Sequence, residues 1–360
     1  MLLFLGAGAS KSFGIPDTKG FLSEFEPRIG NSEIYGKLKS SIPAALLDTE
    51  VLMTVLHDLS KPKEELLDSI APHTTRFLLQ QGAEMARYIE SEDVKVMCHD
   101  MLREVKRTIR TRCLAQVRNE KTQIVASYDA FWANLEIAKG IRAGDKSAVM
   151  LPALSLFTTN YDTCVETYFR VRQVTYSRGI VERFGEYVYD VGRFLRQEQR
   201  SDIELIKLHG SIDFFVKNGQ IRFLPGAGAM DTSAITYLGD EYGPEFMVYP
   251  VESSTSVDLM KSPLIEQLYV FRERLAQNRT WIVIGSTFRD SSLASIMSDV
   301  LMQRAEGDYP TVLHINPEAK RINTYLENKG HALLASLIRP IEYRFVEDSL
   351  WATLRGIPLR

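Results

Sequence analysis

A glycine-rich turn near the start of the chain has the composition of a phosphate-binding loop. The turn follows the apolar run Leu2–Leu5 and consists of Gly6, Ala7, Gly8, Ala9 and Ser10. Glycines lack the Cβ atoms that would keep a phosphate away from the backbone, and a helix beginning after the turn supplies amide donors. A tight strand-to-helix turn without a ligand has the same composition, so the motif alone leaves both interpretations open.

Polar residues also follow four later apolar runs. The runs cover 153–157, 203–208, 281–284 and 311–315, and they lead into Thr158-Thr159-Asn160, His209-Gly210, Gly285-Ser286 and Asn316-Pro317. If the runs are parallel strands, their carboxyl ends share one edge of a sheet, which is where α/β proteins bind ligands. Their side chains are therefore candidate site residues.

The order of these patterns predicts the fold class. Helical spacing lies between the strand-like runs, at 162–170, 260–278, 291–304 and 318–328. Alternating strands and helices predict an α/β fold with a Rossmann-like parallel sheet and helices on both faces. The run from Ile212 to Leu224, with Asn218-Gly219 at its middle, predicts a β-hairpin outside that sheet.

A helical segment separates the glycine turn from the later strands. Residues 51–59 and 63–118 show helical spacing with few glycines. One apolar stripe consists of Val94, Met97, Met101, Val105, Ile109 and Cys113. We expect a discontinuous α/β domain of residues 1–19 and 146–360, with an inserted helical domain at 20–145.

Length, composition and charge limit the class of protein. A chain of 360 residues, 45% apolar and 25% charged, is long enough for two globular units and excludes a fibrous or disordered protein. The 43 basic and 46 acidic residues give a net charge of -3, so no overall basic field attracts nucleic acid.

The cysteines and the apolar runs indicate where the protein works. Cys98, Cys113 and Cys164 are too widely spaced for a disulfide framework or a Cys-x-x-Cys motif, which favours a reducing, cytoplasmic setting. The apolar start is too short for a signal peptide, and no run approaches the ~20 residues of a membrane span. We expect a soluble protein without membrane contact.

Taken together, the motifs resemble the sirtuin-like superfamily in order and spacing. They are the glycine turn with Gly14-Ile15-Pro16, then Thr158-Thr159-Asn160-Tyr161-Asp162, Lys207-Leu208-His209-Gly210-Ser211, Ile284-Gly285-Ser286 and Ile315-Asn316-Pro317. The resemblance is to the divergent prokaryotic branch, many members of which are NAD-cleaving antiviral effectors. It covers about the first 20 residues and most of 150–330.

This resemblance implies NAD binding and assigns roles to the motif residues. Asn160 would be catalytic and orient the ribose hydroxyls or the attacking water. His209 would be the second catalytic residue, because histidine ordinarily titrates near neutral pH and can remove a proton. Asp162 would support Asn160. The residues expected to bind NAD are Gly6, Ala7, Gly8, Ala9, Ser10, Pro16, Asp17, Thr159, Gly285, Ser286 and Asn316.

Structural alternatives exist for each residue. An Asn after two threonines can cap the next helix, as can Asp162. A single histidine is often a structural residue, and Gly285, Ser286 and Asn316 also suit ordinary strand-to-helix turns.

The sequence departs from the protein-deacylating sirtuins in two places. Those enzymes carry two cysteine pairs that hold zinc, and this chain has no such pairs, so no zinc is expected. They also continue Gly-Ile-Pro with Asp-Phe-Arg, whereas this chain has Asp17-Thr18-Lys19. Both differences disfavour deacylation.

The resemblance therefore predicts an NAD glycohydrolase that releases nicotinamide and ADP-ribose, as a regulated effector in prokaryotic antiviral defence. Cyclisation of NAD shares the first step with hydrolysis, so the sequence leaves both products open. A binding subunit that senses NAD or ADP-ribose is the alternative, and a deacylase is a third. The helical domain would carry homo-oligomer contacts or a regulatory partner. Similar proteins are often encoded beside a partner ATPase, helicase or Argonaute-type protein.

A basic stretch at 95–118 remains to be explained. It contains seven Lys and Arg residues against Asp100 and Glu104. No aromatic side chain is interleaved to stack on bases, so a solvated helix face is favoured and direct nucleic-acid binding is not expected.

Overall fold

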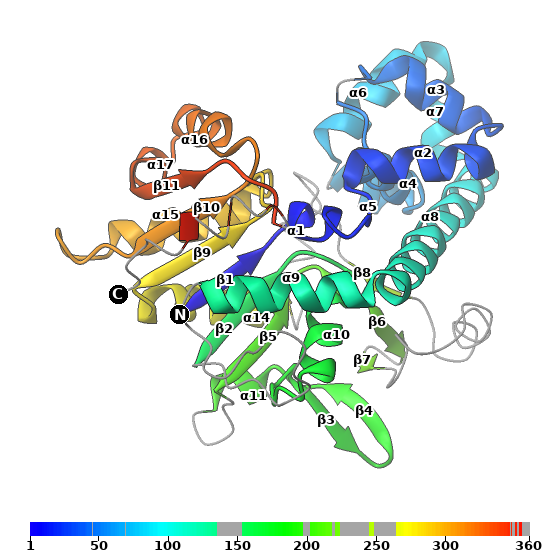
Figure 1. Cartoon of the computed structure of the whole chain (residues 1–360). Coiled ribbons are helices and arrows are strands. Elements are labelled where there is room, and N and C mark those ends of the chain that lie inside the picture. The colour runs from blue at the N-terminus through cyan, green and yellow to red at the C-terminus, as the bar shows by residue number, and fades with distance from the viewer. Residues whose placement is uncertain are drawn as a thin grey trace. The chain divides into compact units, whose positions relative to one another are not determined.

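The computed structural model divides the chain into two compact units (Figure 1). The first contains Met1–Ile15, Cys113–Phe246 and Pro263–Arg360, and the second contains Pro16–Arg112 and Met247–Ser262. The residues that the structure describes are 1–44, 46–68, 70–134, 153–196, 202–217, 220–223, 245–247, 264–345, 347, 350 and 353–354. No helix among them is both long and apolar enough to cross a membrane.

A six-stranded parallel sheet forms the centre of the first unit (Figure 1). Its strands, in spatial order, are β11 (Ile338–Ile341), β10 (Thr311–Ile315), β9 (Thr280–Ile284), β1 (Leu2–Leu5), β2 (Leu154–Thr158) and β5 (Ile203–Lys207). The chain thus extends the sheet first to one side of β1 and then to the other, which is the Rossmann order. The predicted α/β fold is confirmed.

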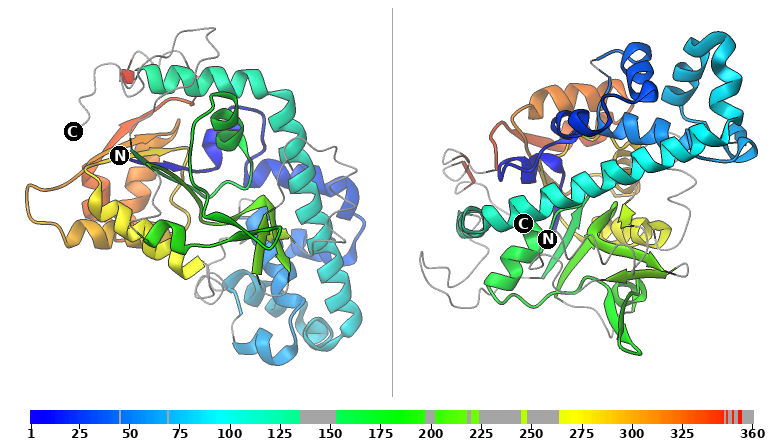
Figure 2. Two further views of the ribbon diagram at one scale, coloured as in Figure 1. Left: turned by 90° about the horizontal axis from the view of Figure 1, so that it is seen from below. Right: turned by 90° about the vertical axis from the view of Figure 1, so that its right-hand side faces the viewer.

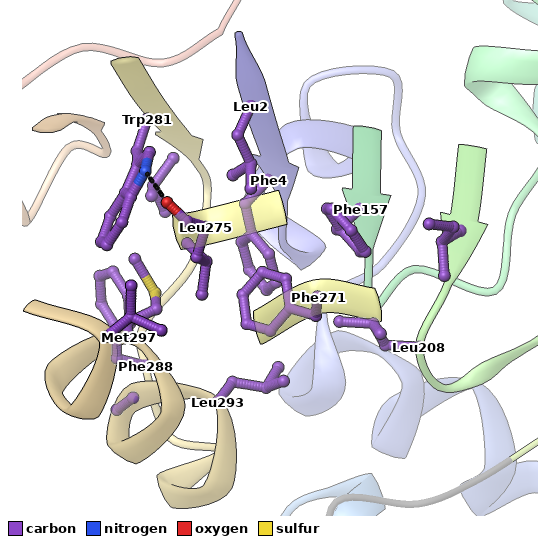
Figure 3. Close-up of a cluster of buried hydrophobic side chains, with 14 of the residues drawn as sticks. Leu2, Phe4, Phe157, Leu208, Phe271, Leu275, Trp281, Phe288, Leu293 and Met297 are labelled. Atoms are coloured by element: carbon purple, nitrogen blue, oxygen red, sulfur yellow. Dashed lines mark hydrogen bonds between the residues drawn. The ribbon is translucent and has the colours of Figure 1, made fainter. Parts of the chain in front are cut away.

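Helices cover both faces of this sheet, so its strands are mostly apolar, and β1, β2, β5 and β9 are buried along their whole length. Helices α14 (Leu264–Gln277) and α15 (Ser291–Met302) lie on one face, and α9 (Lys121–Asn134) and α10 (Cys164–Val171) lie on the other (Figure 2). Figure 3 shows the core on the α14 side. There Phe271 packs against Phe4 and Phe157, with ring centroids 5.9 and 4.9 Å apart.

Further helices of the first unit lie next to the strands in the chain. Helix α1 (Ala7–Lys11) follows β1 directly, and α11 (Gly192–Leu195) precedes β5. Helices α16 (Ala319–Asn328) and α17 (Ala332–Leu337) connect β10 to β11 and pack against each other.

A second sheet, of five strands, extends from the first unit. Its order is β3 (Ile180–Arg183), β4 (Glu186–Tyr189), β7 (Gln220–Phe223), β6 (Gly210–Lys217) and β8 (Glu245–Met247). Antiparallel pairing of β6 with β7 confirms the predicted hairpin, whose turn at 218–219 lies outside the described residues. The β3–β4 hairpin is not predicted, because Phe184 occupies a left-handed turn position (φ 53°) where Gly or Asn is expected.

The second unit is helical from Pro16 to Arg112. Its helices are α2 (Thr18–Ile29), α3 (Glu33–Ser41), α4 (Thr49–Leu59), α5 (Lys63–Asp68), α6 (Pro72–Gln81), the 3₁₀ helix η1 (Gly82–Glu84), α7 (Met85–Glu90) and most of α8 (Glu92–Asn119). Stacked Phe21 and Phe25 contribute to its core. The buried carboxylate of Asp58 accepts hydrogen bonds from the Ala71 amide and the Thr74 hydroxyl.

Helix α8 carries the predicted apolar stripe and the basic stretch. Every residue of the stripe is buried except Met97, which is half-buried. Several basic residues pair with acidic neighbours, including Arg103 with Asp100 and Arg112 with Glu24. Such pairs are typical of a solvated, salt-bridged helix face.

A buried charge network joins the ends of β2 and β5. Lys207, the last residue of β5, is 2% exposed. Its ammonium group donates to the carbonyl oxygens of Asp162 and Tyr161 and lies 3.3 Å from the Glu166 carboxylate. Arg178 completes the network by pairing with Glu166 and Asp213. Each of these buried charges therefore has an opposite charge beside it.

Substituting Gly285 should destabilise the fold strongly. Gly285 has φ +66°, and a Cβ there would lie 2.1 Å from the Ala9 amide nitrogen, which belongs to the backbone. Gly307 also has positive φ (+87°) but has open space around it. We expect Gly307→Ala to cost roughly 1–2 kcal/mol from its backbone conformation alone, and Gly285→Ala to cost at least twice as much in chemical denaturation. Equal losses would contradict the close approach.

Removing the Lys207 ammonium should also destabilise the first unit. Lys207→Met leaves two carbonyl oxygens without their donor and removes a counter-charge, so we expect a loss of about 3–5 kcal/mol in unfolding free energy. The control is Lys320→Met, because Lys320 is 72% exposed in its ion pair with Glu342. This variant should leave the unfolding free energy and the thermal midpoint unchanged, whereas Lys207→Met should lower both. A similar midpoint for both variants would refute the structural role of Lys207.

Candidate active site

Most of the predicted site residues lie at one edge of the parallel sheet. The glycine turn follows β1, Thr159 and Asn160 follow β2, His209 follows β5, Gly285 and Ser286 follow β9, and Asn316 follows β10. This edge includes the switch point between β1 and β9, where doubly wound sheets bind ligands. Pro16 and Asp17 belong to the second unit, where the Asp17 carboxylate accepts from the Gly20 amide (2.8 Å) and caps α2.

The glycine turn packs directly against the loop after β9. The amide of Gly6 donates to the Ile284 carbonyl (2.8 Å), and that of Gly8 donates to the Gly285 carbonyl (2.9 Å). A Cβ on Gly6 would lie 2.7 Å from the Cα of Ser286, and one on Gly8 would lie 2.7 Å from the Cα of Gly285. The close contact between the two loops thus explains why glycine occupies both positions, whether or not a ligand binds there. Beside them, the exposed Ala7 begins α1, and its amide has no acceptor within the helix.

Asn160 is fixed against the glycine turn. Its side-chain nitrogen Nδ2 donates to the Gly6 carbonyl (3.0 Å) and to the Ser10 hydroxyl (2.9 Å). These two bonds use both Nδ2 hydrogens, and no described residue donates to its Oδ1. Asn160 therefore links β2 to the β1 turn and keeps one acceptor for another group.

The side chain of Asp162, and not that of Asn160, accepts a hydrogen bond from the first amide of α10. Its carboxylate accepts from the Cys164 amide (2.9 Å), as the capping alternative predicts. Its carbonyl accepts from Lys207, so the same residue also holds the loop that carries Asn160. Thr159 continues that loop, and its amide donates to the Leu5 carbonyl (3.2 Å).

His209 occupies the two-residue connection between the two sheets and is 5% exposed. Its Nε2 lies 3.0 Å from Oδ2 of Asp290. Burial alone would raise the pKa of Asp290, but the hydrogen bond to His209 and the amides of Leu293 and Ser292 hold that pKa below its ordinary value. The carboxylate is therefore charged at neutral pH.

Asp290 is a residue that the sequence does not assign to the site. It precedes an apolar helix, and its Oδ1 accepts from the Ser292 and Leu293 amides as an ordinary N-cap. A sequence shows the capping position but not the histidine that approaches the second oxygen.

Asn316 and Ser286 hold each other at the β9 side of the edge. The Ser286 carbonyl accepts from Asn316 Nδ2 (3.0 Å) and from His314 Nε2 (2.9 Å), while Asn316 Oδ1 accepts from the Glu318 amide (2.9 Å). Burial lowers the pKa of His314 to about 4, so this ring is neutral and supports the loop. Both polar atoms of the Asn316 side chain are engaged in shaping the edge.

The sheet register places Asn160 and His209 at matching positions. Thr158 of β2 is paired with Lys207 of β5, and the Leu208 amide donates to the Thr158 carbonyl (2.9 Å). Asn160 and His209 each follow their paired residue by two positions. Two neighbouring strand ends thus present an oriented amide and a carboxylate-bound imidazole.

Within the described ranges, no group of three or more His, Cys, Asp and Glu side chains could hold a metal ion. The three cysteines are buried and form no disulfide with one another. Burial raises the pKa of Cys98 to about 12 and that of Cys164 well above its usual range, so neither favours the thiolate form.

Comparison with known proteins places this arrangement in a family. The sequence model of the SIR2-like domain matches residues 154–334, just over half of the chain, and that range contains Asn160, His209 and Asp290. No curated protein matches the chain. Since the match covers just over half of the chain and includes β2, β5, β9 and β10 with the loops that follow them, the chain belongs to the SIR2-like domain family of the sirtuin-like, NAD-dependent superfamily.

Proposed function

We propose that this protein hydrolyses the bond between nicotinamide and ribose in NAD. The observation that carries the proposal is that Asn160 and His209 each lie two residues beyond the paired strand ends Thr158 and Lys207, so that two side chains suited to ribose chemistry follow adjacent strands. Membership of the SIR2-like family supports NAD as the substrate.

The reaction needs a positioned ribose and a base that removes a proton from the attacking water. The bond from ribose C1′ to the nicotinamide nitrogen breaks with its electron pair on nitrogen, so nicotinamide leaves as a neutral base. Water forms the new bond to C1′ and loses a proton, which gives ADP-ribose. Positive charge collects on the ribose in the transition state, where an oriented acceptor and a base are most useful.

The two central residues can supply these roles. Oδ1 of Asn160 would accept from a ribose hydroxyl or from the attacking water, because Nδ2 is already held by Gly6 and Ser10. His209 would take the proton of the water, and Asp290 beside it favours the charged ring that results. An oriented acceptor and a base are the groups that this chemistry needs.

The donors at this edge fit a dinucleotide. Ala7 offers a helix-start amide for a phosphate, and the polar side chains of Ser10, Thr159 and Asn160 suit ribose hydroxyls. Gly6, Gly8, Ala9, Gly285, Ser286 and Asn316 would act by shaping the backbone around the substrate.

Cleavage of NAD endangers the cell that makes the enzyme, so the activity needs control. We propose that the helical segment regulates the activity through contacts between copies of the chain or with a partner protein. Prokaryotic antiviral defence is the setting that we propose for such a regulated effector.

Nicotinamide release by the purified chain tests the proposal. We expect incubation with NAD to yield nicotinamide and ADP-ribose, separated by chromatography from cyclic ADP-ribose. Asn160→Ala and His209→Ala should each lower the rate by about 10²–10⁴-fold, the usual contribution of a positioned acid–base group. His99→Ala is the matched control, because His99 lies exposed on α8 and should leave the rate unchanged.

Three outcomes would overturn the proposal. Wild-type rates in both site variants would remove these residues from the mechanism. Calorimetric binding of NAD without nicotinamide release would favour a sensor or assembly subunit. NAD-dependent removal of acetyl groups from a lysine peptide would favour a deacylase.

A further inference from the structure

The loop from β9 to α15 has a strained backbone. Gly285 has φ +66°, and three residues later Phe288 has φ +52°. A bulky side chain in the left-handed region is an outlier that costs free energy, so the surrounding structure must enforce it.

Buried contacts hold this loop in place. The Phe288 amide donates to the Ser286 hydroxyl (3.1 Å), and its ring, 5% exposed, lies 5.2 Å from the His314 ring. Figure 3 shows Phe288 among the core side chains, near Met297. The loop therefore reaches α15 by one defined path, which ends at Asp290.

The two oxygens of the Asp290 carboxylate have different hydrogen-bond partners. Oδ1 accepts from the Ser292 and Leu293 amides at the start of α15, and Oδ2 faces Nε2 of His209. The helix amides fix the orientation of the carboxylate, so Oδ2 has little freedom to leave the histidine.

This geometry determines which ring nitrogen of His209 carries hydrogen. An ionised carboxylate can only accept, so Nε2 must donate the hydrogen bond to Asp290. In the neutral ring the lone pair then lies on Nδ1. No described residue forms a hydrogen bond with Nδ1 of His209.

We propose that Asp290 is a positioning residue that holds His209 in the Nε2–H tautomer, so that Nδ1 is the atom that removes the proton. The ion pair with Asp290 also stabilises the imidazolium once Nδ1 has taken that proton. The catalytic part of this inference rests on the proposed function of His209, whereas the tautomer is a property of the protein alone.

Asp290→Asn tests the inference with little change in shape. Asn caps helices as well as Asp does, so its side-chain oxygen should stay on the α15 amides. The amide NH₂ would then face Nε2 of His209, which must accept, and the ring hydrogen would move to Nδ1. Nitrogen-15 NMR of the full chain distinguishes the two tautomers, with the His209 signals assigned from their loss in His209→Gln.

We expect the Nε2–H tautomer in the wild type and the Nδ1–H tautomer in Asp290→Asn. Nicotinamide release should fall by about 10²–10⁴-fold in the variant, while the dissociation constant for NAD stays unchanged. The control is Asp48→Asn, because Asp48 caps α4 through the Val51 amide (3.1 Å). It should alter neither the His209 signals nor the rate.

The two readouts separate this inference from the proposed function. A wild-type ring protonated on Nδ1, or a tautomer unchanged in Asp290→Asn, would overturn the positioning role even if His209→Ala is inactive. A changed tautomer with full nicotinamide release would also overturn it. A changed tautomer together with full activity of His209→Ala would instead refute the proposed role of His209.

Discussion

The close approach of two backbone turns is the constraint on which the rest of this structure depends. The turn after β1 and the turn after β9 touch where Gly6 and Gly8 meet Gly285 and Ser286, with no room for a Cβ atom. This contact joins the two turns beside the switch point of the sheet, where α1 begins at Ala7. It also places the Gly6 carbonyl and the Ser10 hydroxyl so that Asn160 can bind both.

The candidate site is consequently built from backbone on one side and side chains on the other. The turn after β1 donates the amides of Gly6 and Gly8 to the carbonyls of Ile284 and Gly285 on the β9 side. The strands β2 and β5 contribute Asn160 and His209, and the buried ammonium of Lys207 holds their two loops together. Burial makes that ammonium costly unless it is fully paired, so the network specifies one arrangement of the loops.

The sequence predicts the parallel sheet well, because strands buried on both faces are continuous apolar runs that end in polar residues. It also predicts that Asn160 and His209 share an edge, since both follow such runs. It does not predict β3 and β4, because Phe184 stands at the turn position where Gly or Asn is expected. Nor does it predict Asp290, because contacts between residues 81 positions apart depend on the path of the strained β9–α15 loop.

The order of strands also affects how the protein is made. Leu2 of the central strand pairs with Ser155 on one side and with Trp281 on the other. During synthesis β1 is therefore without its second neighbour until β9 has left the ribosome, and Asp290 follows only afterwards. Such long-range pairing slows folding. It also means that a nascent chain cannot assemble the edge with His209 and Asp290 before residue 290 has been translated.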